Sequence, residues 1–349
     1  MVLTRRILKV GFFGSDNFSV NCLKRILPLT KGENPVISSL DIITRSPKVG
    51  GRGMKLIRDV PIATFAQENN LNLLRADKKS DLIELTKNDY NIAIAVSYGK
   101  LIPNEFLAAL QFGGLNVHPS VLPKYSGPAP LHRALLNGDK VTGCTIQTLH
   151  PTTFDKGDIL LQQDYKIEEN TDLSKLSKDL SFLGGDLLAT TLKNGLFDST
   201  APTYKTISPV EKFSYAGKVF KNESQINWDE DSSVEILRKY LTLGPLFTFK
   251  KATPKKKKAN TPLSKRVVLS DIGITKDITP TEAKNLQKNG DFVISDDLSS
   301  IVVKSKVGYV KSGNLKAESF GEEKPKEFFN GLRKKFGNEE HSFHFTQLE

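Results

Sequence analysis

The fold class is decided near the N-terminus by residues 7–27, ILKVGFFGSDNFSVNCLKRIL. Residues 7–13 form an apolar run typical of a buried strand. The next four residues, Gly-Ser-Asp-Asn, favour a turn, and the pattern over 18–27 predicts a helix. A buried strand followed by a tight turn and a helix is the opening expected of an α/β sheet.

The same alternation of strands and helices continues to about residue 194. Further strands are predicted over 37–44, 71–75, 92–98, 114–118 and 142–149. Helices are predicted over 62–69, 81–89, 103–110, 128–137 and 172–194. We therefore expect a Rossmann-like, mostly parallel sheet with helices on both faces. The first turn lacks the full Gly-x-Gly-x-x-Gly dinucleotide fingerprint, and sites in such sheets lie at the carboxyl ends of the strands.

After this region the pattern changes to short β-rich runs. They lie at 267–269, 291–294, 301–304 and 308–310, preceded by one helix at 233–241. This pattern favours a small β-barrel of the OB-like class, which often binds single-stranded nucleic acid. We expect a first domain over 1–196, a linker over 197–210 and a barrel domain over 211–349.

Composition describes a globular chain of two domains. It has 349 residues, a formal charge of +11, and 38% hydrophobic and 26% charged residues. No stretch approaches the ~18 consecutive apolar residues of a membrane-spanning helix. The two cysteines, Cys22 and Cys144, form no CxxC pair, so we expect neither a disulfide scaffold nor a metal site.

Positive charge is concentrated in one stretch. Residues 238–266 contain ten Lys or Arg and no acidic residue, including the run Lys255-Lys256-Lys257-Lys258. A solvated loop is the simpler interpretation of a lysine run. The length without counter-charge favours an extended polyanion, most plausibly nucleic acid, as the partner.

Candidate catalytic residues lie at the end of the strand at 114–118. Asn116 and His118 are two residues apart, so both side chains project from one face. An amide can donate to an oxyanion, and an imidazole can move a proton near neutral pH. Asp155, further along the chain, is placed to orient the imidazole. No Ser or Cys nucleophile accompanies them, which favours direct group transfer from a carrier.

In combination these residues resemble the folate-dependent formyltransferases. The matching motifs are Asn116-x-His118, Ser120-Val121-Leu122-Pro123, Ser126-Gly127-Pro128-Ala129-Pro130 and Asp155-x-Gly157-Asp158. The segments 13–18, 51–53 and 96–103 match as well, so the resemblance covers most of residues 7–165. Two departures stand out: Val121 replaces a common Leu, which is a mild change, and Lys124-Tyr125-Ser126 replaces a commoner Arg-aromatic-Arg run, which removes one cation.

The resemblance, strongest to members that act on tRNA, implies a reaction. The donor would be 10-formyltetrahydrofolate, and the acceptor would be the amino group of methionyl initiator tRNA, with no metal. Asn116, His118 and Asp155 would be the catalytic residues. By the same resemblance, the folate-binding residues would be Ser97, Tyr98, Gly99, Leu101, Ile102, Ser120, Leu122, Pro123, Gly157 and Asp158.

The tRNA contacts are expected in two places. The first is the loop around Arg52, because an arginine can pair with phosphate and stack on an unpaired base. The second is the basic stretch of the barrel domain. The expected residues are Arg45, Lys48, Arg52, Lys55, Lys250, Lys251, Lys255, Lys256, Lys257 and Lys258.

Two other functions stay open from the sequence. One is formyl transfer to a small amine, such as a nucleotide sugar or a glycinamide nucleotide. The other is RNA binding by a relative that has lost catalysis. We expect a monomer that does not bind membranes. It would act in the mitochondrial matrix, in a fungal form with only residues 1–6 as a leader, the bacterial cytoplasm being the alternative.

Overall fold

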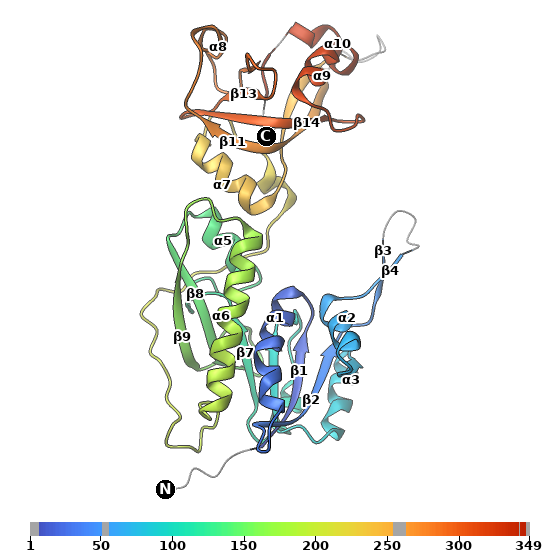
Figure 1. The fold of residues 1–349 in the computed structure, drawn as a ribbon, viewed down its shortest axis with the longest axis vertical. Coiled ribbons are helices and arrows are strands. Elements are labelled where there is room, and N and C mark those ends of the chain that lie inside the picture. The colour runs from blue at the N-terminus through green and yellow to red at the C-terminus, as the bar shows by residue number, and fades with distance from the viewer. Residues whose placement is uncertain (1–6, 51–55, 254–262, 342, 347–349) are drawn as a thin grey trace. The chain divides into compact units, whose positions relative to one another are not determined.

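The computed structural model describes residues 7–50, 56–253, 263–341 and 343–346 (Figure 1). The chain forms two compact units. The first comprises the residues up to Ala134 together with Asp139–Lys218, and the second comprises Leu135–Gly138 and Val219–Glu349. The segment from residue 197 to Lys218 belongs to the first unit, and within it Ile207 N donates to Ile159 O at 2.8 Å. Our division of the chain at 196 and 211 stays a prediction.

Seven strands among the described residues form the sheet of the first unit, in the order β5-β2-β1-β6-β7-β8-β9. They are β1 (Leu8–Gly14), β2 (Ile37–Thr44), β5 (Asn72–Arg75), β6 (Ile92–Val96), β7 (Gly114–His118), β8 (Val141–Thr148) and β9 (Ile159–Lys166). The pairs from β5 to β7 are parallel, and β8 and β9 are added antiparallel. The predicted Rossmann-like, mostly parallel sheet is confirmed.

The helices of this unit begin and end close to their predicted positions. They are α1 (Asn17–Ile26), α2 (Pro61–Glu68), α3 (Lys79–Glu84), α4 (Asn104–Ala108), α5 (Pro130–Leu136) and α6 (Leu173–Lys193), with short 3-10 turns at Leu27–Thr30 and Leu85–Lys87. Helix α1 starts where the Asp16 side chain accepts a hydrogen bond from Ser19 N at 3.0 Å. This N-cap satisfies one of the free N–H groups at the helix start.

Helices cover both faces of the sheet. A β-carbon placed on Gly184 of α6 would lie 2.7 Å from Val117 of β7, so α6 packs closely on that face. The opposite face carries a core cluster that includes Ala95 of β6, Leu82 of α3 and Phe106 of α4. Asn116 pairs in register with Ala95 and therefore shares its face.

A separate two-stranded ribbon joins β3 (Lys48–Gly50) to β4 (Leu56–Arg58). It carries the loop in which Arg52 and Lys55 are expected to meet tRNA. Those two residues lie outside the described part of the chain.

The second unit is an antiparallel, curled sheet in the order β10-β11-β14-β13-β12. Its strands are β10 (Leu246–Ala252), β11 (Leu263–Thr275), β12 (Phe292–Ile294), β13 (Ile301–Lys304) and β14 (Tyr309–Ala317). Its helices are α7 (Ser233–Leu243), α8 (Pro280–Asn285), α9 (Pro325–Asn330) and α10 (Leu332–Phe336), with 3-10 turns at Lys221–Ser224 and Gly337–His341. This sheet agrees with the expected barrel-like domain.

The core of the second unit is built on one tryptophan. Trp228 is 2% exposed and stacks on Phe345, and its indole N–H donates to Thr248 Oγ1 at 2.8 Å. Because a buried indole N–H needs an acceptor, this hydrogen bond fixes the ring. Across both units, no helix in the described residues is long and apolar enough to cross a membrane.

Candidate active site

Asn116 and His118 lie at the carboxyl end of β7, on the face that α6 does not cover. In register, Asn116 pairs with Gln147 of β8 and His118 pairs with Thr145. His118 is 5% exposed, whereas Asn116 is only partly buried. This is the edge of the sheet where the sequence predicted a site.

Both ring nitrogens of His118 face oxygen atoms. Nδ1 lies 3.3 Å from Asp155 Oδ1, and Nε2 donates to the carbonyl oxygen of Tyr125 at 2.9 Å. A neutral imidazole has only one N–H, so a protonated ring can donate to both oxygens at once. The structure therefore brings His118 and Asp155 together as the sequence predicted.

Asp155 is held by several hydrogen bonds in a nearly buried position. Its Oδ2 accepts from Gly127 N at 2.7 Å, and its Oδ1 accepts from Gln147 Nε2 at 3.3 Å. Burial by itself would raise the pKa of Asp155, but His118 and these donors outweigh it and the pKa lies below its usual value. The residue has a left-handed φ of 55°, a conformation in which Asp is enriched. The carboxylate thus stays charged next to the imidazole.

The loop that carries Asp155 is fixed against the end of β8 by Gly157. A β-carbon at this position would lie 1.7 Å from the carbonyl oxygen of Thr148. Gly157 N also donates to Gln147 Oε1 at 3.2 Å, and Asp158 N donates to Thr148 Oγ1 at 2.8 Å. Only glycine fits this approach, so Gly157 positions the loop.

Gln147 is a site residue that we missed in the sequence. It is 1% exposed, and its amide bridges the Asp155 carboxylate and the Gly157 N–H. The segment 142–149 also contains three threonines, so no local feature of the sequence singled out Gln147. It became informative only once the register placed it opposite Asn116.

The Asn116 amide is available for a substrate. Within the described part of the chain, its side chain has no hydrogen-bond partner. The neighbouring polar side chains His118, Asp155 and Gln147 are all engaged with one another or with backbone groups. An amide with a free N–H₂ beside an imidazole suits the stabilisation of a developing oxyanion.

The expected folate residues after β6 divide into two groups. Ser97, Gly99 and Leu101 are exposed, and Ser97 and Gly99 have φ values of 49° and 75° that end the strand at Val96, two residues earlier than predicted. Tyr98 and Ile102 are buried in the core. The Tyr98 hydroxyl donates to Ala76 O at 3.2 Å, and burial raises its pKa to about 12. Any folate contact by Tyr98 would therefore use its backbone.

The expected folate residues after β7 hold their own loop. The Ser120 hydroxyl donates to Lys124 O at 2.6 Å. The Leu122 side chain is buried, and the backbone N–H of Leu122 donates a hydrogen bond to Thr145 Oγ1. Pro123 is partly buried, and exposed Asp158 accepts from the Tyr204 hydroxyl at 3.1 Å. The side chains of Ser120 and Leu122 thus shape the loop that carries Tyr125.

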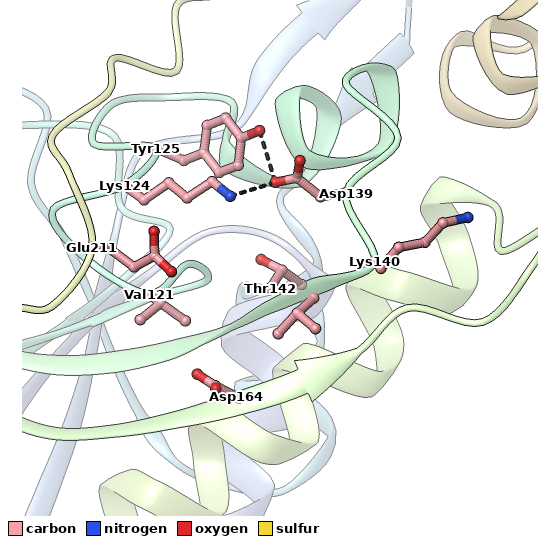
Figure 2. A pocket seen from close by; sticks show the side chains of 9 residues that line it. Val121, Lys124, Tyr125, Asp139, Lys140, Thr142, Asp164 and Glu211 are labelled. Atoms are coloured by element: carbon pink, nitrogen blue, oxygen red, sulfur yellow. Dashed lines mark hydrogen bonds and ion pairs between the residues drawn. The ribbon is translucent and has the colours of Figure 1, made fainter.

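A cavity of about 180 Å³ lies behind this loop (Figure 2). Lys124 Nζ and the Tyr125 hydroxyl converge on Asp139 Oδ2, each at 2.9 Å. The Asp139 carboxylate raises the pKa of Lys124. None of the candidate catalytic side chains lines this cavity. Its polar groups hold Tyr125, whose carbonyl oxygen receives the His118 N–H.

The expected tRNA contacts include one error. Lys250 is fully buried in the second unit, where its amino group donates to Glu339 O at 2.8 Å and lies over the Phe336 ring. Alternation along β10 turns Lys250 inward and Lys251 outward, and Lys251 is exposed. A buried ammonium cannot reach a phosphate, so Lys250 is not a tRNA contact.

The remaining cations are partly described. Lys48 is exposed on β3, and Arg45 is half-buried with its guanidinium on Ser46 O. Lys255, Lys256, Lys257 and Lys258 lie outside the described residues. In the described part of the chain, no group of three or more His, Cys, Asp or Glu could hold a metal ion.

Known proteins resemble this chain in sequence and in fold. The family model described as formyl transferase matches residues 8–192. The mitochondrial methionyl-tRNA formyltransferase of Saccharomyces cerevisiae is 34% identical over 371 residues, covering 95% of this chain and 90% of that protein. The methionyl-tRNA formyltransferase of Caldicellulosiruptor saccharolyticus is 32% identical over 338 residues, covering 95% of this chain and 99% of that protein.

A solved structure shares the fold at lower identity. It is the N-formyltransferase from Helicobacter canadensis in complex with folinic acid and dTDP-3-aminofucose. The TM-score is 0.55 at 15% identity, with 88% of this chain and 99% of that chain covered. This likeness shows a common fold.

Proposed function

The chain belongs to the formyl transferase family, and we propose that within it this protein transfers a formyl group to the amino group of methionyl initiator tRNA. The donor would be 10-formyltetrahydrofolate. The observation that carries this proposal is the hydrogen-bonded cluster at the end of β7, where His118, Asp155 and Gly127 lie beside the free Asn116 amide. Both relatives named above are methionyl-tRNA formyltransferases, and their similarity to this protein extends over nearly its whole chain.

The proposed reaction is a direct acyl transfer. The uncharged amine of the acceptor attacks the formyl carbon, so a new C–N bond forms and the carbonyl oxygen gains negative charge. The bond between the formyl carbon and N10 of the donor then breaks, and the amine loses one proton while N10 gains one. The enzyme must hold two reactants together and stabilise the tetrahedral oxyanion.

Asn116 would donate its amide N–H to the oxyanion. A preorganised donor of this kind costs little reorganisation in the transition state, because β7 already fixes its position. His118 would add positive charge and carry the proton between the amine and N10.

For direct contact with a reactant, the His118 N–H at Nε2 would leave the Tyr125 carbonyl that it meets in this structure. Asp155 would act behind His118. Its carboxylate, held charged by the Gly127 N–H and by the imidazole, fixes the orientation of that ring. Asp155 is therefore proposed as a positioning residue that need not touch either substrate.

We also propose the mitochondrial matrix as the site of action, because the yeast relative is named as mitochondrial. A fungal source fits the same similarity. We keep the expectation of a monomer as part of the proposal.

The test is a formyl-transfer assay on the purified full chain. It supplies 10-formyltetrahydrofolate with methionyl initiator tRNA, methionyl elongator tRNA or free methionine. The proposal expects transfer to the initiator tRNA in preference to the other two acceptors. Transfer only to small amines, such as a nucleotide sugar, would overturn the tRNA assignment and support a small-amine formyltransferase. Binding of tRNA without any transfer would support an inactive relative.

A further inference from the structure

Two aromatic side chains that the proposed mechanism does not use lie exposed close to His118 and Asp155. Phe213 is 57% exposed and Tyr215 is 67% exposed. Both belong to the first unit. Large aromatic surfaces left open to water beside a site are typical of binding surfaces, because their hydration is unfavourable. We call Phe213 and Tyr215 the aromatic shelf.

The segment that carries the shelf is fixed. It runs along the loop after β7, where Ser126 N donates to Ser214 O at 2.9 Å and Ala216 N donates to Ser126 O at 2.7 Å. Arg133 fixes the C-terminal end of this segment. Its Nε donates a hydrogen bond to Gly217 O at 3.0 Å, and its Nη2 donates one to Lys218 O at 2.8 Å. A rigid backbone presents the aromatic rings in place, so a ligand would spend little entropy in ordering them.

The Tyr215 ring rests on two glycines. A β-carbon on Gly127 would lie 2.7 Å from Tyr215 Cε2, and one on Gly217 would lie 3.4 Å from Cε1. The ring is therefore supported by backbone, while two-thirds of the residue stays open to solvent. This is the arrangement of a stacking platform, in which a planar ligand can cover an aromatic surface.

The shelf adjoins the catalytic cluster through two direct neighbours. Gly127, which supports Tyr215, donates its N–H to Asp155 Oδ2 at 2.7 Å. Lys156, the residue after Asp155, places its amino group 4.2 Å from the centre of the Phe213 ring. A group stacked on the shelf would thus lie next to the loop that carries Asp155.

Cations outnumber acids in the sequence around the shelf. Lys156, Lys212 and Lys218 are all exposed, and the exposed acids next to them in the sequence are Glu211 and Asp158. Aromatic rings interleaved with cations are typical of single-stranded nucleic acid sites, where bases stack and the flanking phosphates meet the cations. The charge pattern therefore favours a nucleotide over a neutral ring.

We propose that the aromatic shelf stacks the unpaired nucleobase at the 3′ end of the acceptor tRNA. The inference rests on the proposed function, in which the reacting amine belongs to an amino acid esterified to that terminal nucleotide. Only the ribose, the ester and the α-carbon of the amino acid separate the base from the amine. When the amine reaches His118, the base lies within reach of Tyr215 and Phe213, and Lys156 is placed to meet the adjacent phosphate.

The experiment uses the full chain and an uncharged initiator tRNA with 2-aminopurine in place of the terminal adenine. Stacking quenches this fluorophore. We expect quenching with the unsubstituted chain, and with Tyr215→Ala a loss of quenching and a binding constant weaker by about 5- to 150-fold, from 1–3 kcal/mol per stacked base. Tyr215→Phe keeps the aromatic ring and should retain both signals.

Two controls make the result specific to the terminal base. Val210→Ala removes an apolar side chain that is 98% exposed in the same segment, and it should change nothing. A tRNA that lacks the terminal nucleotide should bind the unsubstituted chain and Tyr215→Ala equally. Tyr215→Leu keeps an apolar side chain packed against Gly127 but removes the aromatic ring. It therefore separates the loss of stacking from the loss of contacts that support the loop.

The outcomes distinguish this inference from the proposed function. Undiminished quenching and affinity in Tyr215→Ala, with normal formyl transfer by the unsubstituted chain, would overturn the stacking site alone. A higher KM for the formyl donor with unchanged tRNA affinity would assign the shelf to the donor and overturn the inference. Quenching that depends on Tyr215 supports the shelf even if the unsubstituted chain transfers no formyl group, a result that would count against the proposed function.

Discussion

Asp155 in the first unit and Lys250 in the second are both shielded from solvent, and the two groups behave differently. In the first unit, Asp155 is nearly buried, which would raise its pKa, yet His118 and the donors Gly127 N and Gln147 Nε2 keep that pKa below the usual value. In the second unit, Lys250 is fully buried against Glu339 O and an aromatic ring, and burial lowers its pKa to about 8.

The difference shows what surroundings do to a buried charge. Asp155 faces an imidazole that can carry the opposite charge, so the charged form is preferred. Around Lys250, burial lowers the pKa more than the nearby Glu339 charge raises it, so the neutral form gains. The first arrangement suits catalysis because it holds charge ready, whereas the second contributes to the packing of the barrel-like unit.

The largest expected effect tests the charged cluster of the first unit. Replacing His118 with Ala should lower kcat for formyl transfer about 10²- to 10⁴-fold, since it removes both proton transfer and positive charge. Asn116→Ala should cost about 10²- to 10³-fold through the lost oxyanion donor. Steady-state kinetics measure both effects, and unchanged thermal melting serves as the control. A rate close to that of the unsubstituted chain would remove the residue from the mechanism.

A smaller effect tests Lys250 through stability. Its pKa is about 8 in the folded state and 10.5 as an ordinary lysine, so between these values the unfolded chain binds more protons. Stability should therefore rise with pH over this window, by about 2–3 kcal/mol.

Lys250→Met removes the titrating group and should flatten that rise. Denaturant unfolding at several pH values between 8 and 10 measures it, with Lys251→Met as the exposed neighbour for comparison. An equally steep rise in Lys250→Met would show that another group causes it.

The smallest expected effect concerns the salt dependence of tRNA binding, in which Lys250 and Lys251 should differ. If exposed Lys251 contacts a phosphate, Lys251→Ala should reduce the slope of log K against log salt by about one. Lys250→Met should leave the slope unchanged, because a buried amino group meets no phosphate. Binding titrations at several salt concentrations check this, and equal slopes for Lys251→Ala and the unsubstituted chain would exclude Lys251 from the interface.

The same two regions show how far the sequence predicts the structure. The catalytic end of β7 was predictable because alternation along one strand places Asn116 and His118 on one face. The role of Asp155 came from its motif. Its contact with Gly127 and Gln147 depends on how three separate segments meet, and no local pattern contains that information.

In the second unit, the charge pattern predicted one tRNA contact wrongly. We counted Lys250 among the cations of a basic stretch, although the same residues form β10, in which successive side chains point to opposite sides. Strand β11 extends over Leu263–Thr275, far beyond the short run predicted. Its polar and charged residues hide the strand from a search for apolar runs, since only one side of the strand is buried.

The two cysteines beneath α6 have a practical consequence. Cys22 Sγ contacts Ser181 O and Cys144 Sγ contacts Leu180 O, both at 3.2 Å, and both thiols are fully buried. They are the only cysteines in the sequence. Because both thiols are buried against α6, the rate of their modification by a thiol reagent would report local opening of the structure around α6. The chain thus contains an intrinsic reporter of local opening, with Cys144 on the face of the sheet opposite His118.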